Sequence, residues 1–202
     1  MDTTKEAPAV AAVVRERVRT AKPGTFLRSK DFAGSARAVD SELSRLSTRG
    51  ELRRVRRGLY WRGTPTRFGM SAPSPLEVAL AVAGPGAGPA GVAAAHQLGL
   101  TTQVPATVEI AAPGKTPEPL PGVRFTARSF ARRERKLNPT EVAVLEVLRE
   151  PHSAEASWEE IGQTVQRLVK TRKVRPELIA AEVADEHHVQ ARRHWDELAV
   201  SL

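Results

Sequence analysis

Cysteine is absent from this chain of 202 residues, and aromatic residues make up only 4% of it. Without cysteine there are no disulfides, zinc fingers, iron–sulfur clusters or thiol nucleophiles. No apolar run approaches the roughly 20 residues that cross a bilayer, and the first residues, MDTTKEAPAV, lack the pattern of a secretory signal. With 41% hydrophobic and 27% charged residues, the composition is globular. We therefore expect a cytoplasmic protein with no membrane partner.

Positive charge is in excess and is unevenly placed along the chain, whose formal net charge is +8. Residues 1–67 contain 16 Lys and Arg against 7 Asp and Glu, a net of +9, whereas residues 68–202 contain 15 against 16, a net of −1. An arginine-rich composition of GC-rich coding sequences would also give a basic balance. The asymmetry nevertheless predicts a polyanion-binding domain over residues 1–66 and a domain with a different role over residues 67–202.

The basic third predicts a series of short elements. Each has a stop or cap signal of its own, since proline, glycine and serine stand at the boundaries. The predicted elements are a helix over Ala7–Thr20, an extended segment Thr25–Leu27, a short helix Ser29–Ala33 capped by Ser29, and a longer helix Ala36–Thr48 capped by Ser35 and closed by Gly50.

The helix Ala36–Thr48 has two contrasting faces. Its apolar face is formed by Ala36, Val39, Leu43 and Leu46, which are spaced to pack on a small core. The opposite face carries Arg37, Ser41, Ser44 and Thr48, with Asp40 and Arg45 on its flanks. Small polar side chains allow close approach to a major groove, where arginine contacts guanine edges or phosphates. An ordinary amphipathic helix with a solvated face would show the same pattern.

The segment ELRRVRRGLYWRG predicts a basic two-stranded hairpin. Apolar residues alternate from Leu52 to Trp61 around a turn at Arg56-Arg57-Gly58, and Gly63–Arg67 reads as a short linker. Arginines so crowded repel one another unless they meet a polyanion. Two helices and a basic hairpin predict a DNA-binding winged helix-turn-helix. The expected contact residues are Ser35, Arg37, Ser41, Ser44, Arg45, Arg49, Arg53, Arg54, Arg56 and Arg57.

The same stretch resembles a known family. Gly24-Thr25-Phe26, the run Leu43–Gly50 and the hairpin Leu52–Tyr60 are similar to the N-terminal domain of AbiEi-type antitoxins of abortive-infection systems. The close resemblance covers residues 24–62. It implies a bacterial antitoxin and transcriptional autorepressor that binds inverted repeats of double-stranded DNA in its own promoter. It also implies a second domain that counteracts a nucleotidyltransferase-type toxin, by direct binding or by opposing its effect.

The second domain is predicted to mix helices with two strands, so that the whole chain is α+β, mostly helical, and ends in helices. The predicted helices are Pro75–Ala83, Val92–Leu98, one that opens at Asn138-Pro139, and roughly 158–171, 176–184 and 187–200, and the predicted strands are Thr107–Ala111 and Val123–Ser129.

A glycine pattern in this domain, Gly86, Gly88 and Gly91, spells GxGxxG. A dinucleotide site needs a strand before this pattern and an acidic residue about 20 residues later. The capping signal Ser74-Pro75-Leu76-Glu77 indicates a preceding helix instead, and Glu109 is a poor match for the acidic residue. We interpret Gly84–Gly91 as a turn between two helices.

No catalytic, cofactor or metal site is expected. His187, His188 and His194 stand near Asp185, Glu186 and Glu197, but they lack metal-ligand spacing and are interpreted as solvated helix residues. The chain also has no G-x-S-x-G nucleophile motif. We therefore expect a binding protein, and an enzyme acting on nucleic acid is disfavoured. The alternative is a winged-helix repressor without a toxin partner, in which Gly84–Gly91 and Ala112–Gly122 border a metabolite pocket.

Overall fold

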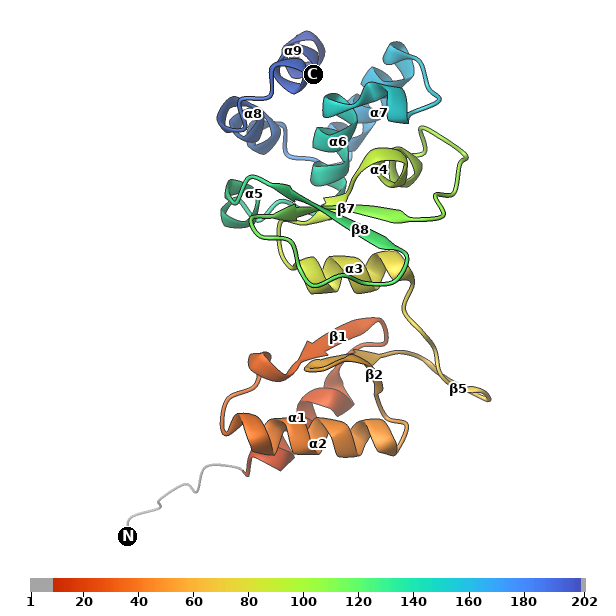
Figure 1. Cartoon of the computed structure of the whole chain (residues 1–202), viewed down its shortest axis with the longest axis vertical. Coiled ribbons are helices and arrows are strands. Elements are labelled where there is room, and N and C mark those ends of the chain that lie inside the picture. The colour runs from red at the N-terminus through yellow and green to blue at the C-terminus, as the bar shows by residue number, and fades with distance from the viewer. Residues whose placement is uncertain (1–8, 201–202) are drawn as a thin grey trace. The chain divides into compact units, whose positions relative to one another are not determined.

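A computed structural model of the chain describes residues 9–200. These residues divide into two compact units, the first ending at Ser74 and the second beginning at Pro75 (Figure 1). The charge pattern of the sequence predicted this boundary between residues 66 and 67. The segment beyond Gly63 is more than a linker, because β4 (Pro65–Thr66) and β5 (Gly69–Met70) pair as a small antiparallel hairpin.

The first unit contains two helices and a three-stranded antiparallel sheet whose strand order is β1-β3-β2. In Figure 1 the sheet and the two helices form two layers. The elements are α1 (Val10–Thr20), β1 (Thr25–Arg28), the single 3-10 turn η1 (Ser29–Asp31), α2 (Ala36–Thr48), β2 (Arg53–Arg56) and β3 (Leu59–Arg62).

The sequence predicted these elements with three differences. The first helix begins at Val10, and the predicted residues Ala7 and Pro8 lie outside the described residues. The predicted short helix is one 3-10 turn in which Ser29 is not the cap, because the backbone returns to an extended conformation at Phe32. The predicted two-stranded hairpin is joined by β1, which pairs with β3 and widens it into a sheet.

A small apolar core holds the first unit together. It is formed by Val14, Val18, Leu27, Val39, Leu43, Leu46, Leu52 and Tyr60, all of which are buried. The prediction for Ala36 was wrong: this residue is exposed, because the packed stretch of α2 begins one turn later, at Val39. Glu42 is buried at the edge of this face instead.

The second unit is α+β, and about half of the whole chain is helical. Its sheet has the order β6-β7-β8, with β6 antiparallel and β8 parallel to β7. The elements are α3 (Pro75–Ala83), β6 (Gly88–Pro89), α4 (Gly91–Leu98), β7 (Val108–Pro113), β8 (Val123–Arg128), α5 (Ala131–Glu134), α6 (Pro139–Arg149), η2 (Pro151–Ser153), α7 (Trp158–Lys170), α8 (Pro176–Asp185) and α9 (Val189–Ala199).

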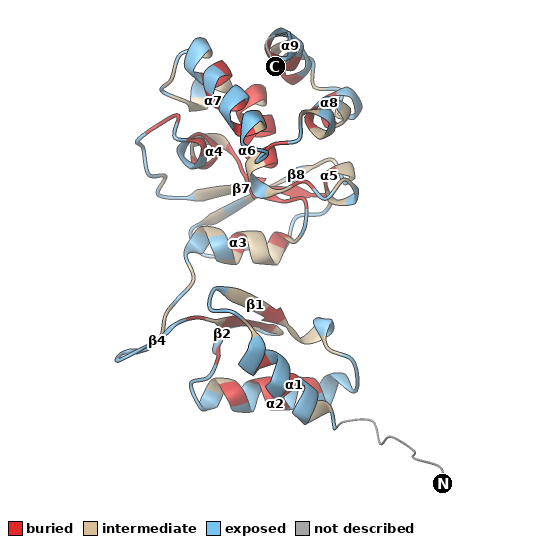
Figure 2. Ribbon diagram, turned by 180° about the vertical axis from the view of Figure 1, so that it is seen from behind, coloured by how far each residue is buried: buried red, intermediate tan, exposed pale blue. Residues whose placement is uncertain are grey.

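Helices cover both faces of this sheet (Figure 1). Successive side chains of a strand point to opposite faces, and accordingly Ile110 and Ala112 of β7 pack with α3 while Ala111 joins the core around α4 and α6. Helix α6 is buried along most of its length, which Figure 2 shows in red. Its capping box, Asn138 with Glu141, fixes where it begins.

Two features of the second unit were not predicted. The glycine-rich turn contains strand β6, which pairs with β7 and passes so close to α6 that a Cβ atom on Gly88 would lie 2.4 Å from Cβ of Val142. The sequence also did not predict α5, which has four residues, or η2, which has three, because such short elements show no periodic pattern of apolar residues. None of the described helices is long and apolar enough to cross a membrane.

Arg132 is the centre of a buried charge cluster in the second unit. Its guanidinium is fully buried and lies between carboxylates of α6 and α8. Nη1 of Arg132 donates to Glu146 at 2.7 Å, and its Nε donates to Glu186 at 2.6 Å. Around this centre, Arg128 and Arg149 bind the same two carboxylates from the periphery, with distances of 2.7 Å. The hydrogen bonds to arginine hold the pKa of Glu146 below its usual value, against the effect of burial.

Replacing Arg132 by methionine is expected to lower the free energy of unfolding by about 3–5 kcal/mol. The substitution removes the buried central countercharge and leaves Glu146 and Glu186 paired, among the described residues, only with the peripheral Arg128 and Arg149. Urea unfolding at neutral pH measures this. The control is Arg124→Met, which removes an exposed partner of Glu109 and should cost less than about 1 kcal/mol. Equal effects of the two substitutions would contradict a central role for Arg132.

Candidate nucleic-acid interface

A hollow of about 340 Å³ lies on the first unit, between α2 and the hairpin formed by β2 and β3. Its walls come from two elements that are adjacent in sequence, and both contribute arginine. Helix α2 contributes Arg37, Asp40, Ser41 and Ser44, and the hairpin contributes Arg54, Arg57, Gly58 and Tyr60. Five of the predicted contact residues, Arg37, Ser41, Ser44, Arg54 and Arg57, are thus brought together in one place.

The polar residues of helix α2 face this hollow because the apolar face of the helix packs in the core. Residues three and four apart lie on the same side of a helix, which places Ser41 and Ser44 beside Arg37. All three are exposed, whereas Leu43 and Leu46 are buried against α1 and the sheet. The burial of the apolar stripe therefore fixes which face of α2 remains available.

Tyr60 sets the position of the hairpin side of the hollow. In the β2–β3 register Arg54 stands opposite Tyr60, so the two side chains project from the same face of the sheet. The ring of Tyr60 is buried in the core that also contains Leu43, and Arg54, on the same face, lines the hollow with residues of α2. Burial raises the pKa of the Tyr60 hydroxyl, the charge of Arg54 opposes this, and that of Asp40 adds to it.

The turn of the hairpin is held at a defined place. Gly58 adopts a φ of +69°, a conformation that glycine accepts without strain, and its carbonyl accepts a hydrogen bond of 3.1 Å from the backbone N–H of Ser29. This bond ties the turn to η1. Arg57, the residue before Gly58, is exposed there.

The hollow has an excess of positive charge. Three guanidiniums, of Arg37, Arg54 and Arg57, line it together with the single carboxylate of Asp40. Within residues 9–200 none of these four side chains has an ion pair at 4.0 Å or less. Unpaired guanidiniums beside small hydroxyl side chains are suited to bind phosphates and the polar edges of bases.

Arg45 and Arg49 are not part of the hollow. They lie on the flank of α2 that faces α1, around the buried carboxylate of Glu42, which is only 2% exposed. Nη1 of Arg45 lies 2.5 Å from Glu42, and the Nε of Arg49 lies 3.0 Å from Glu51. Arg15 of α1 approaches the same Glu42 carboxylate at 3.9 Å. These arginines are therefore partly neutralised.

The remaining predicted residues occupy other places. Arg53 stands opposite Trp61, on the face of the sheet away from the hollow, and its guanidinium donates to the Met70 carbonyl at 3.4 Å. Arg56 belongs to strand β2 rather than to the turn, because the register shifts between Arg54 and Arg56. Ser35 is the N-cap residue of α2, but its side chain makes no capping hydrogen bond.

Two residues that line the hollow, Tyr60 and Asp40, were not among the predicted contact residues. The sequence pattern grouped Leu59 and Trp61 with Leu52 and Val55 as the alternating apolar residues of the hairpin and left Tyr60 out. In the structure Tyr60 is the residue in the helix-side core, and Trp61 instead packs against Phe26 with ring centroids 4.7 Å apart and the rings tilted by 55°. Neighbouring residues of β3 point to opposite faces of the sheet, so Tyr60 joins Leu27 in the core while Trp61 lies on the other face with Phe26. The position of Asp40, three residues after Arg37, was a usable signal.

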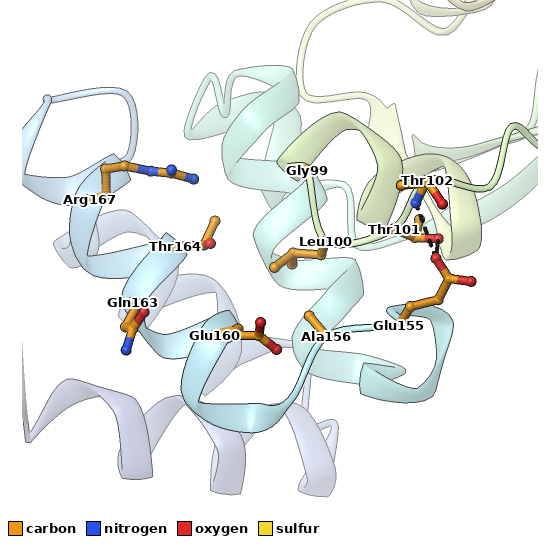
Figure 3. A pocket seen from close by; sticks show the side chains of 10 residues that line it. All are labelled: Gly99, Leu100, Thr101, Thr102, Glu155, Ala156, Glu160, Gln163, Thr164 and Arg167. Atoms are coloured by element: carbon orange, nitrogen blue, oxygen red, sulfur yellow. Dashed lines mark hydrogen bonds between the residues drawn. The ribbon is translucent and has the colours of Figure 1, made fainter.

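The second unit has a hollow of its own, of about 560 Å³. It is lined by Gly99, Leu100, Thr101, Thr102, Glu155, Ala156, Glu160, Gln163, Thr164 and Arg167 (Figure 3). The carboxylate of Glu155 is occupied, since it accepts hydrogen bonds from Thr101, at 2.6 Å, and from Gln103, at 2.8 Å. The lining includes neither Gly84–Gly91 nor Ala112–Gly122, the segments predicted to border a pocket.

The histidines and the glycine pattern have structural partners. His188 accepts the Ala191 N–H at the start of α9, and His194 lies 2.7 Å from the Leu148 carbonyl. Among residues 9–200 no three His, Asp or Glu side chains are grouped to hold a metal ion. The GxGxxG pattern follows helix α3 rather than a strand, and Glu109 pairs with Arg124.

Comparisons with known proteins place the chain in a family but name no activity. Among curated proteins there is no match. A crystal structure of the RV2827C protein from Mycobacterium tuberculosis is similar at 19% sequence identity, covering 97% of this chain and 78% of that one, with a TM-score of 0.41. So low a TM-score supports no conclusion about function. The model of DUF6088, a family of unknown function, matches residues 13–146, and the chain therefore belongs to that family.

Proposed function

We propose that this protein is a DNA-binding transcription regulator that contacts the duplex with α2 and the β2–β3 hairpin. The observation that carries the proposal is the hollow in which Arg37, Arg54 and Arg57 face outward without ion-pair partners in the described residues. A cluster of unpaired guanidiniums is held together against its own repulsion by the core beneath it. A polyanion relieves that repulsion, and DNA presents one phosphate charge per ~1.7 Å of duplex.

The order of elements supports a winged helix-turn-helix interpretation. Helix α1, strand β1, the turn η1, helix α2 and the β2–β3 hairpin follow one another, and β1 lies beside β3. In this interpretation α2 is the recognition helix, the hairpin is the wing, and η1 is a second helix reduced to one turn. The small side chains of Ser41 and Ser44 would let α2 approach the floor of the major groove, where base edges are read.

The two sets of arginines take different roles in this proposal. Arg54 and Arg57 of the hairpin would contact phosphates, and Arg37, at the start of α2, would contact a base edge or a phosphate. Arg45 and Arg49 share carboxylates with Glu42 and Glu51, so they would add less to phosphate binding. Phosphate contacts place the protein on the duplex and base contacts give it specificity.

Arg54→Ala combined with Arg57→Ala is expected to weaken binding to duplex DNA of any sequence and to lower the salt dependence, the slope of log K against log salt, by about two units. Fluorescence anisotropy over a salt series measures both. The control, Arg124→Ala with Arg193→Ala, removes the same charge from the second unit and should leave the slope unchanged. An unchanged slope in the hairpin variant would contradict the proposed interface.

The resemblance to AbiEi antitoxins extends the proposal to an autorepressor and antitoxin. In this form the protein binds inverted repeats in its own promoter, and the second unit counteracts a nucleotidyltransferase-type toxin from a neighbouring gene. The sequence resemblance over residues 24–62 is the only support for this extension.

Co-expression with the adjacent gene tests the antitoxin role. If the role is right, the neighbour alone arrests growth, and the full chain restores it. The Arg54→Ala/Arg57→Ala variant, whose second unit is intact, should restore growth when expressed from a foreign promoter. A neighbour that is harmless, or toxicity that the chain does not relieve, would refute the antitoxin role and leave DNA binding untouched.

A regulator that responds to a small molecule is the second candidate, and the hollow of the second unit favours it. Arg167 and Thr164, one turn apart on α7, line this hollow together with Leu100, which comes from the segment after α4 (Figure 3). Within residues 9–200 neither the guanidinium of Arg167 nor the hydroxyl of Thr164 has a hydrogen-bond partner. A guanidinium and a hydroxyl near the apolar side chains of Leu100 and Ala156 suit an organic carboxylate.

Thermal-shift measurements against a panel of aliphatic and aromatic carboxylates test this candidate. A carboxylate that raises the melting temperature of the protein and changes its affinity for DNA should do neither in the Arg167→Ala variant. Lys170→Ala, on the same helix but outside the hollow, is the control. If no carboxylate in the panel shifts the melting temperature, the hollow is not a carboxylate site.

A further inference from the structure

An acidic side chain stands in the middle of the basic hollow. Asp40 lies on α2 three residues after Arg37 and four before Ser44, so it shares their face of the helix. It is exposed, and within residues 9–200 its carboxylate has neither an ion pair nor a hydrogen bond. The other charged side chains that line the hollow, Arg37, Arg54 and Arg57, are all basic.

A structural role does not account for Asp40. It makes no cap, since the helix begins at Ala36 and the stabilising effect of an acidic residue on a helix N-terminus falls off within the first turn. It fixes no arginine, in contrast to Glu42, which holds Arg45 at 2.5 Å. For the non-specific part of DNA binding it is unfavourable, because a carboxylate repels phosphates. In contact with DNA, a carboxylate is favourable where it meets a hydrogen-bond donor of a base.

The major groove offers few such donors. A carboxylate only accepts hydrogen bonds, and the donors in the groove are the N4 amino group of cytosine and the N6 amino group of adenine. Adenine presents N6 beside the acceptor N7, which repels a carboxylate, and the amide of Asn or Gln fits this pair better. Cytosine presents N4 and no neighbouring acceptor of its own, and Asp or Glu is the side chain that pairs with it.

Resting on the proposed function, we propose that Asp40 is a specificity-determining residue that reads cytosine in the major groove through a hydrogen bond from the N4 amino group. The flanking Arg37 supplies positive charge that offsets the repulsion between the carboxylate and the nearest phosphates. The basic residues of the hollow then give affinity for any duplex, and Asp40 restricts tight binding to sites that place a cytosine opposite it.

Selection from a randomised pool of double-stranded oligonucleotides, followed by a series of single base-pair exchanges in the best site, tests this with the full chain. For the wild type, exchange of one C·G pair should weaken binding by about tenfold or more. Asp40→Asn and Asp40→Ala should bind the exchanged and the original site within about twofold of each other, while they keep the preferences of the wild type at all other pairs. Asp40→Asn should also accept adenine at that pair.

The matched control is Asp31→Asn, which removes the same charge from the same unit at η1, outside the lining of the hollow. It should keep the wild-type preference at the C·G pair. An Asp40→Asn profile identical to that of the wild type at every pair would overturn the assignment while leaving DNA binding in place. A wild-type protein that enriches no sequence and binds no duplex would overturn the proposed function itself, and the assignment with it.

Discussion

The small core that the apolar stripe of α2 shares with Tyr60 holds the helix and the hairpin of the first unit together. Leu43 and Leu46 of the helix are buried in this core, and Leu27 adds strand β1 to it. The exposed charges depend on this core, because Arg37 stands on the reverse side of the packed helix and Arg54 projects from the same face of the sheet as Tyr60. A shift of Tyr60 would therefore move one wall of the hollow relative to the other.

The acidic residues of α2 divide into two kinds by burial. Glu42 is buried on the flank that faces α1, and Arg15, Arg45 and Arg49 lie around its carboxylate. Its negative charge lowers the repulsion between these guanidiniums. Asp40 is exposed on the opposite flank, among arginines that it does not bind. The helix thus carries a neutralised flank and a charged one, and only the charged flank borders the hairpin. The net charge of the unit alone would not reveal this division.

The sequence indicated the helices and the basic hairpin, because caps, glycines and periodic apolar residues are local signals. It did not indicate the face of the hairpin on which each arginine lies, since that depends on the register shift between Arg54 and Arg56. The separation of Arg45 from Arg37 also depends on tertiary structure, through the buried Glu42. Strand β6 was missed for a similar reason, because Gly88 and Pro89 have low strand propensity and form a strand only against β7.

The charge cluster of the second unit joins residues that are far apart in the chain. Arg132 is separated from Glu186 by 54 positions, and its guanidinium is fully buried once both are in place. The chain is synthesised from its N-terminus, so α5 and α6 leave the ribosome before α8. The guanidinium of Arg132 therefore cannot pair with Glu182 and Glu186 until the last quarter of the chain has emerged. The core of the first unit lies between Val14 and Tyr60 and has no such delay. The order of synthesis thus lets the first unit fold while the second is still incomplete.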